Sequence, residues 1–186
     1  MKTKLLLIAM LAGIILFVAC NDAQKSAADI AIKTAQGAYA VIADKANQYV
    51  PDQSKAVREA IDSTKEAYAK GDYAGAFAAA RTLPGKIKDL AAAASARKDE
   101  LTAKWNDLSS KMPGLVAAVQ SRESALSKSH KLPAGANDTL ASAKQIWSAA
   151  AAAFASGQIP DALAKASAAK QKLVDLEPKL GMKPAA

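Results

Sequence analysis

The residue types that carry most enzyme and metal chemistry are scarce in this 186-residue chain. Cys20 is the only cysteine and His130 the only histidine. A single cysteine excludes a disulfide within the chain, and one histidine with one cysteine cannot form an ordinary zinc site. No G-x-S-x-G sequence marks an activated serine. We therefore predict no catalytic residue, no metal and no cofactor, and we expect His130 to be a surface residue.

Aromatic residues are also few, at 9 of 186, whereas alanine makes up about a quarter of the chain. Alanine is the best helix former, and strands favour the β-branched and aromatic residues that are rare here. This composition predicts an all-α fold. Because alanine buries little area, the core must depend on close helix packing and on a few large side chains.

Clustered arginines interleaved with aromatics, which are typical of nucleic-acid binding, are missing as well, so we expect no nucleic-acid partner. The formal net charge is nevertheless +8, and residues 77–186 carry 16 basic against 9 acidic side chains. Lys165, Lys172 and Lys179 recur every seven residues. This stripe indicates either a solvated polar face or a binding surface for anionic polymer or lipid headgroups.

The chain opens with Lys2 and Lys4, followed by an unbroken apolar run over residues 5–19 and then Cys20. Fifteen helical residues span about 22 Å, short of the roughly 30 Å hydrocarbon core of a bilayer. A basic start, a short apolar run and a small residue at position 19 are typical of a secretory leader. An uncleaved signal anchor is the alternative. In both cases the rest of the chain lies outside the cytoplasm, because positive charge stays inside.

A cysteine directly after a small residue resembles the lipobox of bacterial lipoproteins, although Phe17 stands where that family usually has leucine. The resemblance implies cleavage before Cys20 and acylation of its thiol. Membrane lipid is then one partner, and two or three acyl chains hold the protein firmly. Localisation in the bacterial cell envelope follows, and the choice between inner and outer membrane stays open.

Apolar residues recur at alternating steps of three and four through the rest of the chain, which predicts packed helices. A capping box at Ser26–Asp29 predicts the start of the first helix, which Pro51 ends. Further helices are expected over about 52–70, 72–108, 115–126, 140–157 and 160–180. Pro84 should make the third a kinked rod or two nearly collinear helices. We predict a turn at 109–114, and Asn137 or Asp138 as the N-cap after the loop.

Residues 67–90 and 153–176 resemble each other at a shift of 86 positions. Tyr68 then matches Phe154, and Gly71 matches Gly157. We interpret these segments as parts of two related helical hairpins. The corner KGDYAGA (70–76) also resembles the turn of tetratricopeptide repeats, where a glycine, an aromatic and a small residue recur. The resemblance is limited to local packing.

Two sets of polar and aromatic residues could have a function. Glu59, Asp62 and Glu66 share one side of a helix, but the pairs Lys55–Glu59, Arg58–Asp62 and Glu66–Lys70 indicate a solvated ion-pair lattice. Most aromatics fall on the packed seam, which favours a core role. If they are exposed in a groove, they predict a peptide or small-ligand cleft. The candidate partner-binding residues are Tyr73, Phe77, Trp105 and Trp147.

Together these patterns predict an elongated antiparallel helical bundle with two related hairpins, preceded by a signal-peptide helix. The expected divisions are a signal peptide (1–19), a lipid-anchored linker (20–27), a bundle (28–181, with hairpins at about 52–108 and 137–181) and a tail (182–186). The function we predict is a non-enzymatic envelope lipoprotein that acts as a scaffold or binds a protein partner. The alternatives are an anion binder working through the basic half and, third, an enzyme with a cleft of Tyr, Ser and Lys groups.

Overall fold

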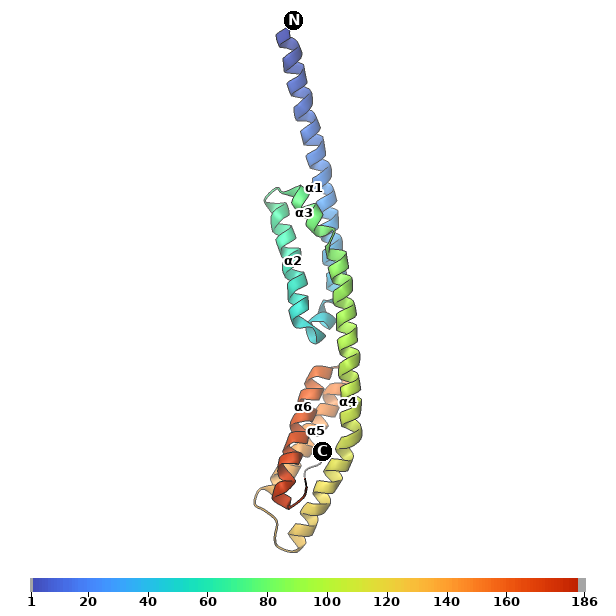
Figure 1. Cartoon of the computed structure of the whole chain (residues 1–186), viewed down its shortest axis with the longest axis vertical. Coiled ribbons are helices and arrows are strands. Elements are labelled where there is room, and N and C mark those ends of the chain that lie inside the picture. Colours follow the sequence, from blue (N-terminus) through green and yellow to red (C-terminus); the bar gives the residue numbers. More distant parts are fainter. Residues whose placement is uncertain (1, 184–186) are drawn as a thin grey trace. The chain divides into compact units, whose positions relative to one another are not determined.

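The computed structural model describes the backbone of residues 2–183 and the side chains of residues 22–183. An all-α fold is confirmed, with no strand in the described backbone (Figure 1). The elements are α1 (Lys2–Tyr49), α2 (Pro51–Ala69), α3 (Tyr73–Ala80), α4 (Leu83–Lys128), α5 (Ala136–Ala155), α6 (Ile159–Leu176) and the 3-10 turn η1 (Pro178–Leu180). The chain divides into two compact units, unit 1 (Met1–Ala96) and unit 2 (Arg97–Ala186).

The first helix is longer than predicted. A helix start at Ser26–Asp29 is wrong, because α1 passes through these residues without a break. No glycine or proline lies between residues 20 and 28 to interrupt the helix. Asp29 acts within the helix, where Lys33 donates to its Oδ2 at 2.7 Å. Residues 20–27, expected as a linker, therefore lie within α1.

Neither Pro84 nor Pro113 interrupts a helix at its own position. The break near Pro84 comes before it, at residues 81–82, and α4 passes through Pro113. α3 ends at Ala80 and α4 begins at Leu83, so there are two helices rather than one kinked rod. Pro84 sits in the first turn of α4, where a missing N–H leaves no helical bond unmade. The turn at 109–114 is wrong, since α4 continues through Pro113. Met112, only 1% exposed, is held in the core and favours continuation of the helix.

The core of unit 1 is formed by α1, α2, α3 and the beginning of α4. The buried apolar residues come from all four helices: Ala28, Ile32, Ala35, Ala46, Val57, Ile61, Ala76, Ala80, Leu83, Ile87 and Leu90. Two polar residues of this unit, Ser54 and Thr64, are buried as well, and Thr64 donates to the Ala60 carbonyl at 2.7 Å. Ser54 donates to Asn47 Oδ1 at 2.7 Å, and its Oγ lies 2.8 Å from the Tyr39 hydroxyl. The buried hydroxyl is thus satisfied on both sides.

Unit 2 is built from the later part of α4 together with α5, α6 and η1. Its main core cluster contains Met112, Val119, Ala136, Leu140, Ala143, Ala169, Leu173, Leu176 and Leu180. Arg122 on α4 donates through Nε to the Leu180 carbonyl at 2.8 Å, which fixes the C-terminal turn against α4. α6 ends at Leu176, earlier than expected, because Pro178 cannot continue the helical bonds.

The predicted N-cap of α5 is wrong by two or three residues. Gly135 is the N-cap, with a φ of 76° that favours glycine, and α5 begins at Ala136. Ala136 is buried, so the core determines where the helix starts. Asn137 and Asp138 then lie in the first turn, where the carboxylate of Asp138 favours the positive end of the helix dipole.

Positions separated by 86 residues adopt the same local structure at one corner of each unit. α2 ends at Ala69 and α5 at Ala155, and the following helices begin at Tyr73 and Ile159. Gly71 and Gly157 both take a left-handed conformation, at φ 85° and 81°. The buried residues correspond too: Ala76 with Ala162, Ala80 with Ala166, Leu83 with Ala169, Ile87 with Leu173, and Leu90 with Leu176.

Candidate functional site

The residues whose side chains could take part in catalysis or metal binding do not form a cluster in the described part of the chain. His130 is exposed in the loop after α4, where it takes a φ of 58°. In the described part of the chain, no group of three His, Cys, Asp or Glu side chains could hold a metal ion. Every buried side-chain N or O atom described has a hydrogen-bond partner. Cys20 lies outside the residues whose side chains are described, so its acylation stays a prediction.

The acidic side of α2 forms an ion-pair lattice, with one change from the predicted pairing. Glu59 pairs with Lys55 at 3.9 Å, and Glu66 pairs with Lys70 at 3.8 Å. Asp62, however, pairs with Lys65 at 3.8 Å rather than with Arg58. These exposed pairs stabilise the helix by only a few tenths of a kcal/mol each (about 0.2–0.5).

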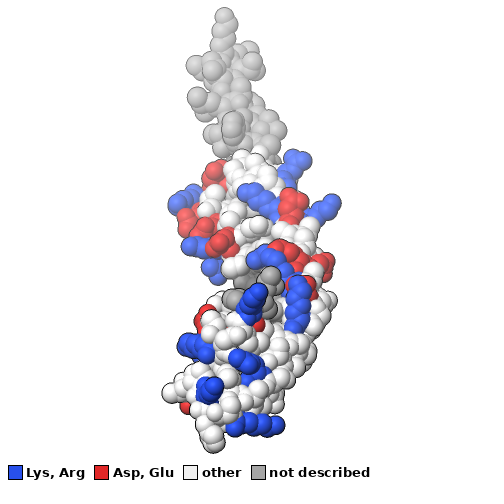
Figure 2. Space-filling model, turned by 60° about the horizontal axis from the view of Figure 1, so that its bottom comes forward, with Lys and Arg blue, Asp and Glu red and all other residues white. Residues whose placement is uncertain are grey.

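The lysine stripe is interrupted by the end of α6. Lys165 is paired with Asp161 one turn away, and Lys172 is half-buried further along the same helix. Lys179 lies in η1, beyond the last residue of α6. Figure 2 brings the lower end of Figure 1 forward and shows its Lys and Arg side chains dispersed, with uncharged surface between them. The predicted anion site therefore has one engaged cation and no compact cluster.

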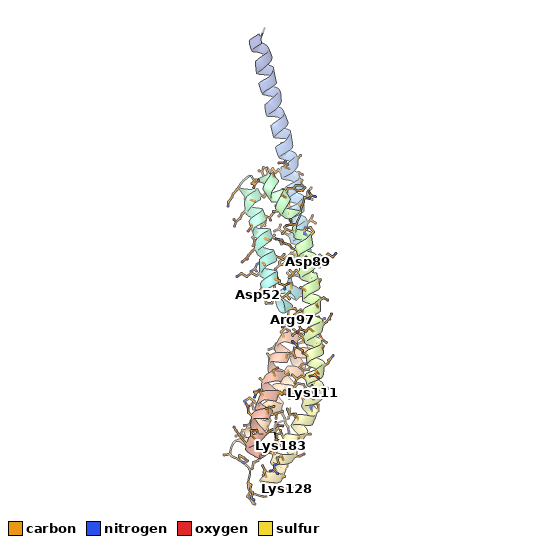
Figure 3. All side chains as sticks on the ribbon, in the orientation of Figure 1. Asp52, Asp89, Arg97, Lys111, Lys128 and Lys183 are labelled. Atoms are coloured by element: carbon orange, nitrogen blue, oxygen red, sulfur yellow. The ribbon has the colours of Figure 1, made fainter. Side chains whose placement is uncertain are left out.

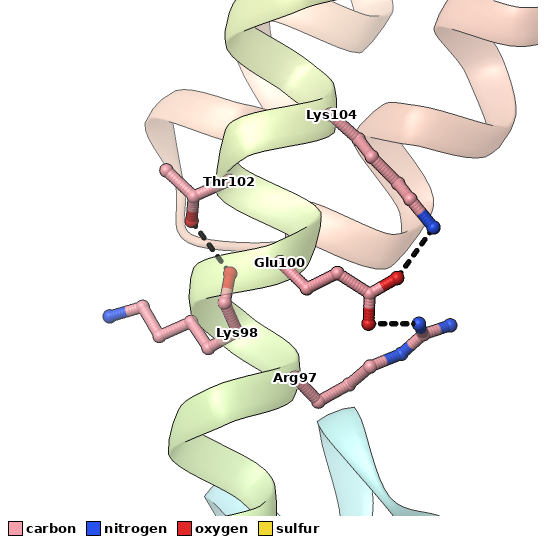
Figure 4. Close-up of polar contacts among 5 residues, drawn as sticks. All are labelled: Arg97, Lys98, Glu100, Thr102 and Lys104. Atoms are coloured by element: carbon pink, nitrogen blue, oxygen red, sulfur yellow. Dashed lines mark hydrogen bonds and ion pairs between the residues drawn. The ribbon is translucent and has the colours of Figure 1, made fainter.

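Among the residues whose side chains are described, three pKa values depart clearly from their ordinary range. Hydrogen bonds from Lys104 and then Arg97 lower the pKa of the exposed Glu100 carboxyl (Figure 4). The hydrogen bond to Asp29 raises the pKa of Lys33, and burial raises the pKa of the Tyr49 hydroxyl. The main cause of each shift is a neighbour on the same helix or burial in the core.

The two aromatic candidates in unit 1 are half-buried at the Gly71 corner. The rings of Tyr73 and Tyr68 meet edge to face, with centroids 5.1 Å apart. Lys25 Nζ lies 5.7 Å from the Tyr73 ring centroid, and the Arg81 guanidinium lies 5.8 Å from that of Phe77. Both cation–π contacts place a charged side chain over a ring that was a candidate for partner binding.

The two aromatic candidates in unit 2 form a three-ring stack with Phe154. Trp105 lies between Trp147 (centroids 5.3 Å apart, planes at 10°) and Phe154 (4.6 Å, 8°). Trp105 is only 6% exposed. Its ring therefore packs within the unit, and Trp147 and Phe154 are the half-buried members of the stack.

The surface of unit 1 contains two hollows that meet at Lys86. The larger, about 500 Å³, is lined by Gln53, Ala56, Val57, Lys86, Asp89, Leu90 and Ala93. The smaller, about 260 Å³, is lined by Ala60, Ser63, Thr64, Ala67, Ala79, Thr82, Leu83 and Lys86. We call the two together the α2–α4 groove. Figure 3 labels Asp89 on the α4 side of this groove.

The walls of the α2–α4 groove have a regular pattern. The residues on α2 are Gln53, Ala56, Ala60, Ser63 and Ala67, and those facing them are Ala79, Thr82, Lys86, Asp89 and Ala93. Both sets advance by steps of three and four. The α2 set is one stripe of that helix, whereas the facing set begins at Ala79 on α3, crosses the break at Thr82 and continues on α4. From Gln53 to Ala67 the stripe is about 21 Å long at 1.5 Å per residue. A groove of this length, with mostly small side chains on both walls, can accept another helix.

The groove was not predicted, although a signal for it exists in the sequence. Each wall residue directly precedes or neighbours a core position, as Ala56 precedes Val57 and Ala60 precedes Ile61. Small residues repeated beside the large core residues mark a second face that could be packed. From the sequence alone, the alanines indicated only helices and close packing in the core.

A further hollow of about 680 Å³ lies in unit 2 between α4 and α6. Leu101, Leu108 and Leu163 give it an apolar floor, with Lys104 and Asp107 among the other lining residues. Both charged groups are already paired, Lys104 with Glu100 and Asp107 with Lys111. This hollow thus offers mainly apolar contact.

Among residues 22–183, no helix has an apolar stretch long enough to cross a membrane. The chain matches no protein-family model, no curated protein and no solved structure.

Proposed function

We propose that the protein is a lipoprotein of the bacterial cell envelope, anchored through Cys20, whose helical units act as a non-enzymatic scaffold for a helical partner. The observation that supports this function is the α2–α4 groove. It is uncharged overall, since Lys86 and Asp89 are its only charged lining residues. An apolar helix seam is the chemistry that such a groove fits.

The proposal includes the internal organisation of the chain. We interpret the corners at Gly71 and Gly157 as the turns of two related helical hairpins, preceded by a leader that is removed before Cys20. The matching backbone conformations at the two corners support this interpretation. Each hairpin packs on a further helix, which is α1 in unit 1 and the later part of α4 in unit 2.

The test of anchoring is the intact mass of the protein isolated from membranes. Acylation predicts a chain that begins at residue 20 and carries added lipid mass. The Cys20→Ser chain is the matched control and should carry none. A mass that still includes Met1 and no lipid would contradict the anchor.

The test of the scaffold role uses a photo-crosslinking amino acid at Ala60, inside the groove, in the full chain in its own membrane. The same group at Arg58, on the exposed side of α2, is the control. We expect one adduct of defined mass from Ala60 and none from Arg58. Filling the groove with Ala93→Trp should remove the adduct. Equal adducts from both positions, or none from Ala60, would refute the role of the groove.

A further inference from the structure

We propose that the α2–α4 groove of unit 1 binds the outer face of α1 from a second copy of this chain. The inference rests on the proposed function, in that the groove takes a helix, and it identifies that helix. The outer face of α1 is defined here by Ile30, Thr34, Gly37 and Val41.

This face carries two large apolar side chains that are exposed to solvent. In the described part of the chain, Ile30 (61% exposed) and Val41 (86%) are the exposed large hydrophobic residues. They are eleven residues apart, about three helical turns, and so share one side of α1. Gly37 lies between them, and nothing lies within 4 Å of the position a Cβ would take there. A helix can therefore approach α1 closely at this point.

The dimensions of the face and the groove agree. Ile30 and Val41 are separated by about 16 Å along α1, within the roughly 21 Å between Gln53 and Ala67. Two large side chains on the incoming helix would meet walls in which alanine, serine and threonine predominate, beside the longer side chains of Gln53, Lys86 and Asp89. Large residues against small ones give the interdigitation that close helix packing needs.

The charges agree as well. None of the four residues that define the outer face of α1 is charged. Lys33 beside it is paired with Asp29, and the exposed Asp44 and Lys45, which follow Val41 by about one turn, carry opposite charges. The groove contributes Lys86 and Asp89, whose charges cancel. Neither surface attracts a strongly charged partner, and neither repels the other.

One molecule cannot fill its own groove in this way. Its α1 already packs against α2, α3 and α4 through the opposite side, with Ala28, Ile32 and Ala35 in the core. A second copy must supply the face, and its own groove stays open for a third. Such a contact is heterologous, so copies add one to the next, in a ring or in an open row. Anchoring in one membrane would raise the effective concentration of the copies.

The experiment uses the full chain in mild detergent, with Cys20→Ser so that introduced cysteines are the only ones. Val41→Cys together with Ala60→Cys should form disulfide-linked dimers and longer species under mild oxidation. Val41→Cys together with Arg58→Cys is the matched control, because Arg58 lies outside the groove. Sedimentation should show association that grows with concentration. Val41→Lys should weaken it about tenfold or more, since an apolar contact is replaced by a buried charge.

The side chain of Val41 makes too little contact for its replacement to unfold the chain, and helix content by circular dichroism checks this. The proposal is overturned if the chain stays monomeric, if Val41→Lys associates as strongly as the parent, or if Val41→Cys links only to another Val41→Cys. Capture of a different protein by the Ala60 probe, with a monomeric chain, would refute this inference and leave the scaffold function standing.

Discussion

Trp105 should be the single largest contributor to the stability of unit 2. On α5, Trp147 and Phe154 are seven residues apart, about 10.5 Å along the helix. This distance leaves space for one aromatic ring between them, and the Trp105 ring occupies it at 5.3 Å from one neighbour and 4.6 Å from the other. Removing the ring therefore leaves a slot with two fixed walls, because both walls belong to the same helix.

Trp105→Ala should destabilise unit 2 by about 3–5 kcal/mol, the usual cost of truncating a buried tryptophan. Part of this comes from the two ring contacts, each about 0.5–1.5 kcal/mol beyond the area buried. Trp105→Phe keeps a ring in the slot and should cost clearly less. A dry apolar slot of this kind can bind a small aromatic molecule, so added indole should recover part of the stability of Trp105→Ala.

The assay is denaturant unfolding followed by tryptophan fluorescence. Both tryptophans of the chain belong to this stack, so the signal reports on unit 2 alone. In Trp105→Ala the remaining Trp147 still reports. A loss below about 1 kcal/mol for Trp105→Ala would refute the packing role, since a partly exposed ring costs about that little. Equal losses for the Ala and Phe variants would refute the stacking contribution.

Three further predictions concern separate parts of the chain. Ser54→Ala should destabilise unit 1 by about 1–3 kcal/mol, because the Tyr39 hydroxyl and the Asn47 amide lose a buried partner, and hydrogen exchange of α1 and α2 amides measures this. Gly71→Ala and Gly157→Ala should each cost about 1–2 kcal/mol, since both positions need a positive φ, and unequal melting shifts for the two would contradict the equivalence of the corners. Lys104→Gln should raise the pKa of Glu100 toward its ordinary value, and NMR titration of the carboxyl measures this. Because the pKa of Glu100 is lowered in the folded chain, the ion pair stabilises the chain slightly above the ordinary carboxyl pKa. This stabilisation is lost as the pH falls through the lowered pKa.

Helix phase and the all-α class could be predicted because they depend on local rules. The steps of three and four located the core positions Ile32, Val57, Ile61, Leu90 and Leu173, all of which are buried. Gly71 marked the end of a helix because its positive φ is a local requirement of the turn.

The helix ends were harder to predict, because packing overrides the local signal. Pro113 looked like a turn, but the burial of Met112 keeps α4 continuous. Asn137 looked like a cap, but the burial of Ala136 starts α5 earlier. In both cases a core contact with a helix far away in the sequence overrides the local signal for a helix end. A short window of sequence does not contain such a contact.

The α2–α4 groove could have been anticipated only in part. The spacing of Ala56, Ala60 and Ala67 shows a second stripe, but helix propensity explains the same alanines equally well. What identifies the groove is that α2 and α4 lie at a distance where both stripes face one space. That distance is a property of tertiary packing.

The unbroken course of α1 has a mechanical consequence. From residue 20 to Ala28, the first buried apolar residue among the side chains described on this helix, the backbone is one continuous helix about 12 Å long. Without a hinge between them, any tilt imposed at residue 20 is transmitted as a lever motion to unit 1. A membrane anchor at residue 20 would then determine both the orientation of unit 1 relative to the membrane and its distance from the membrane.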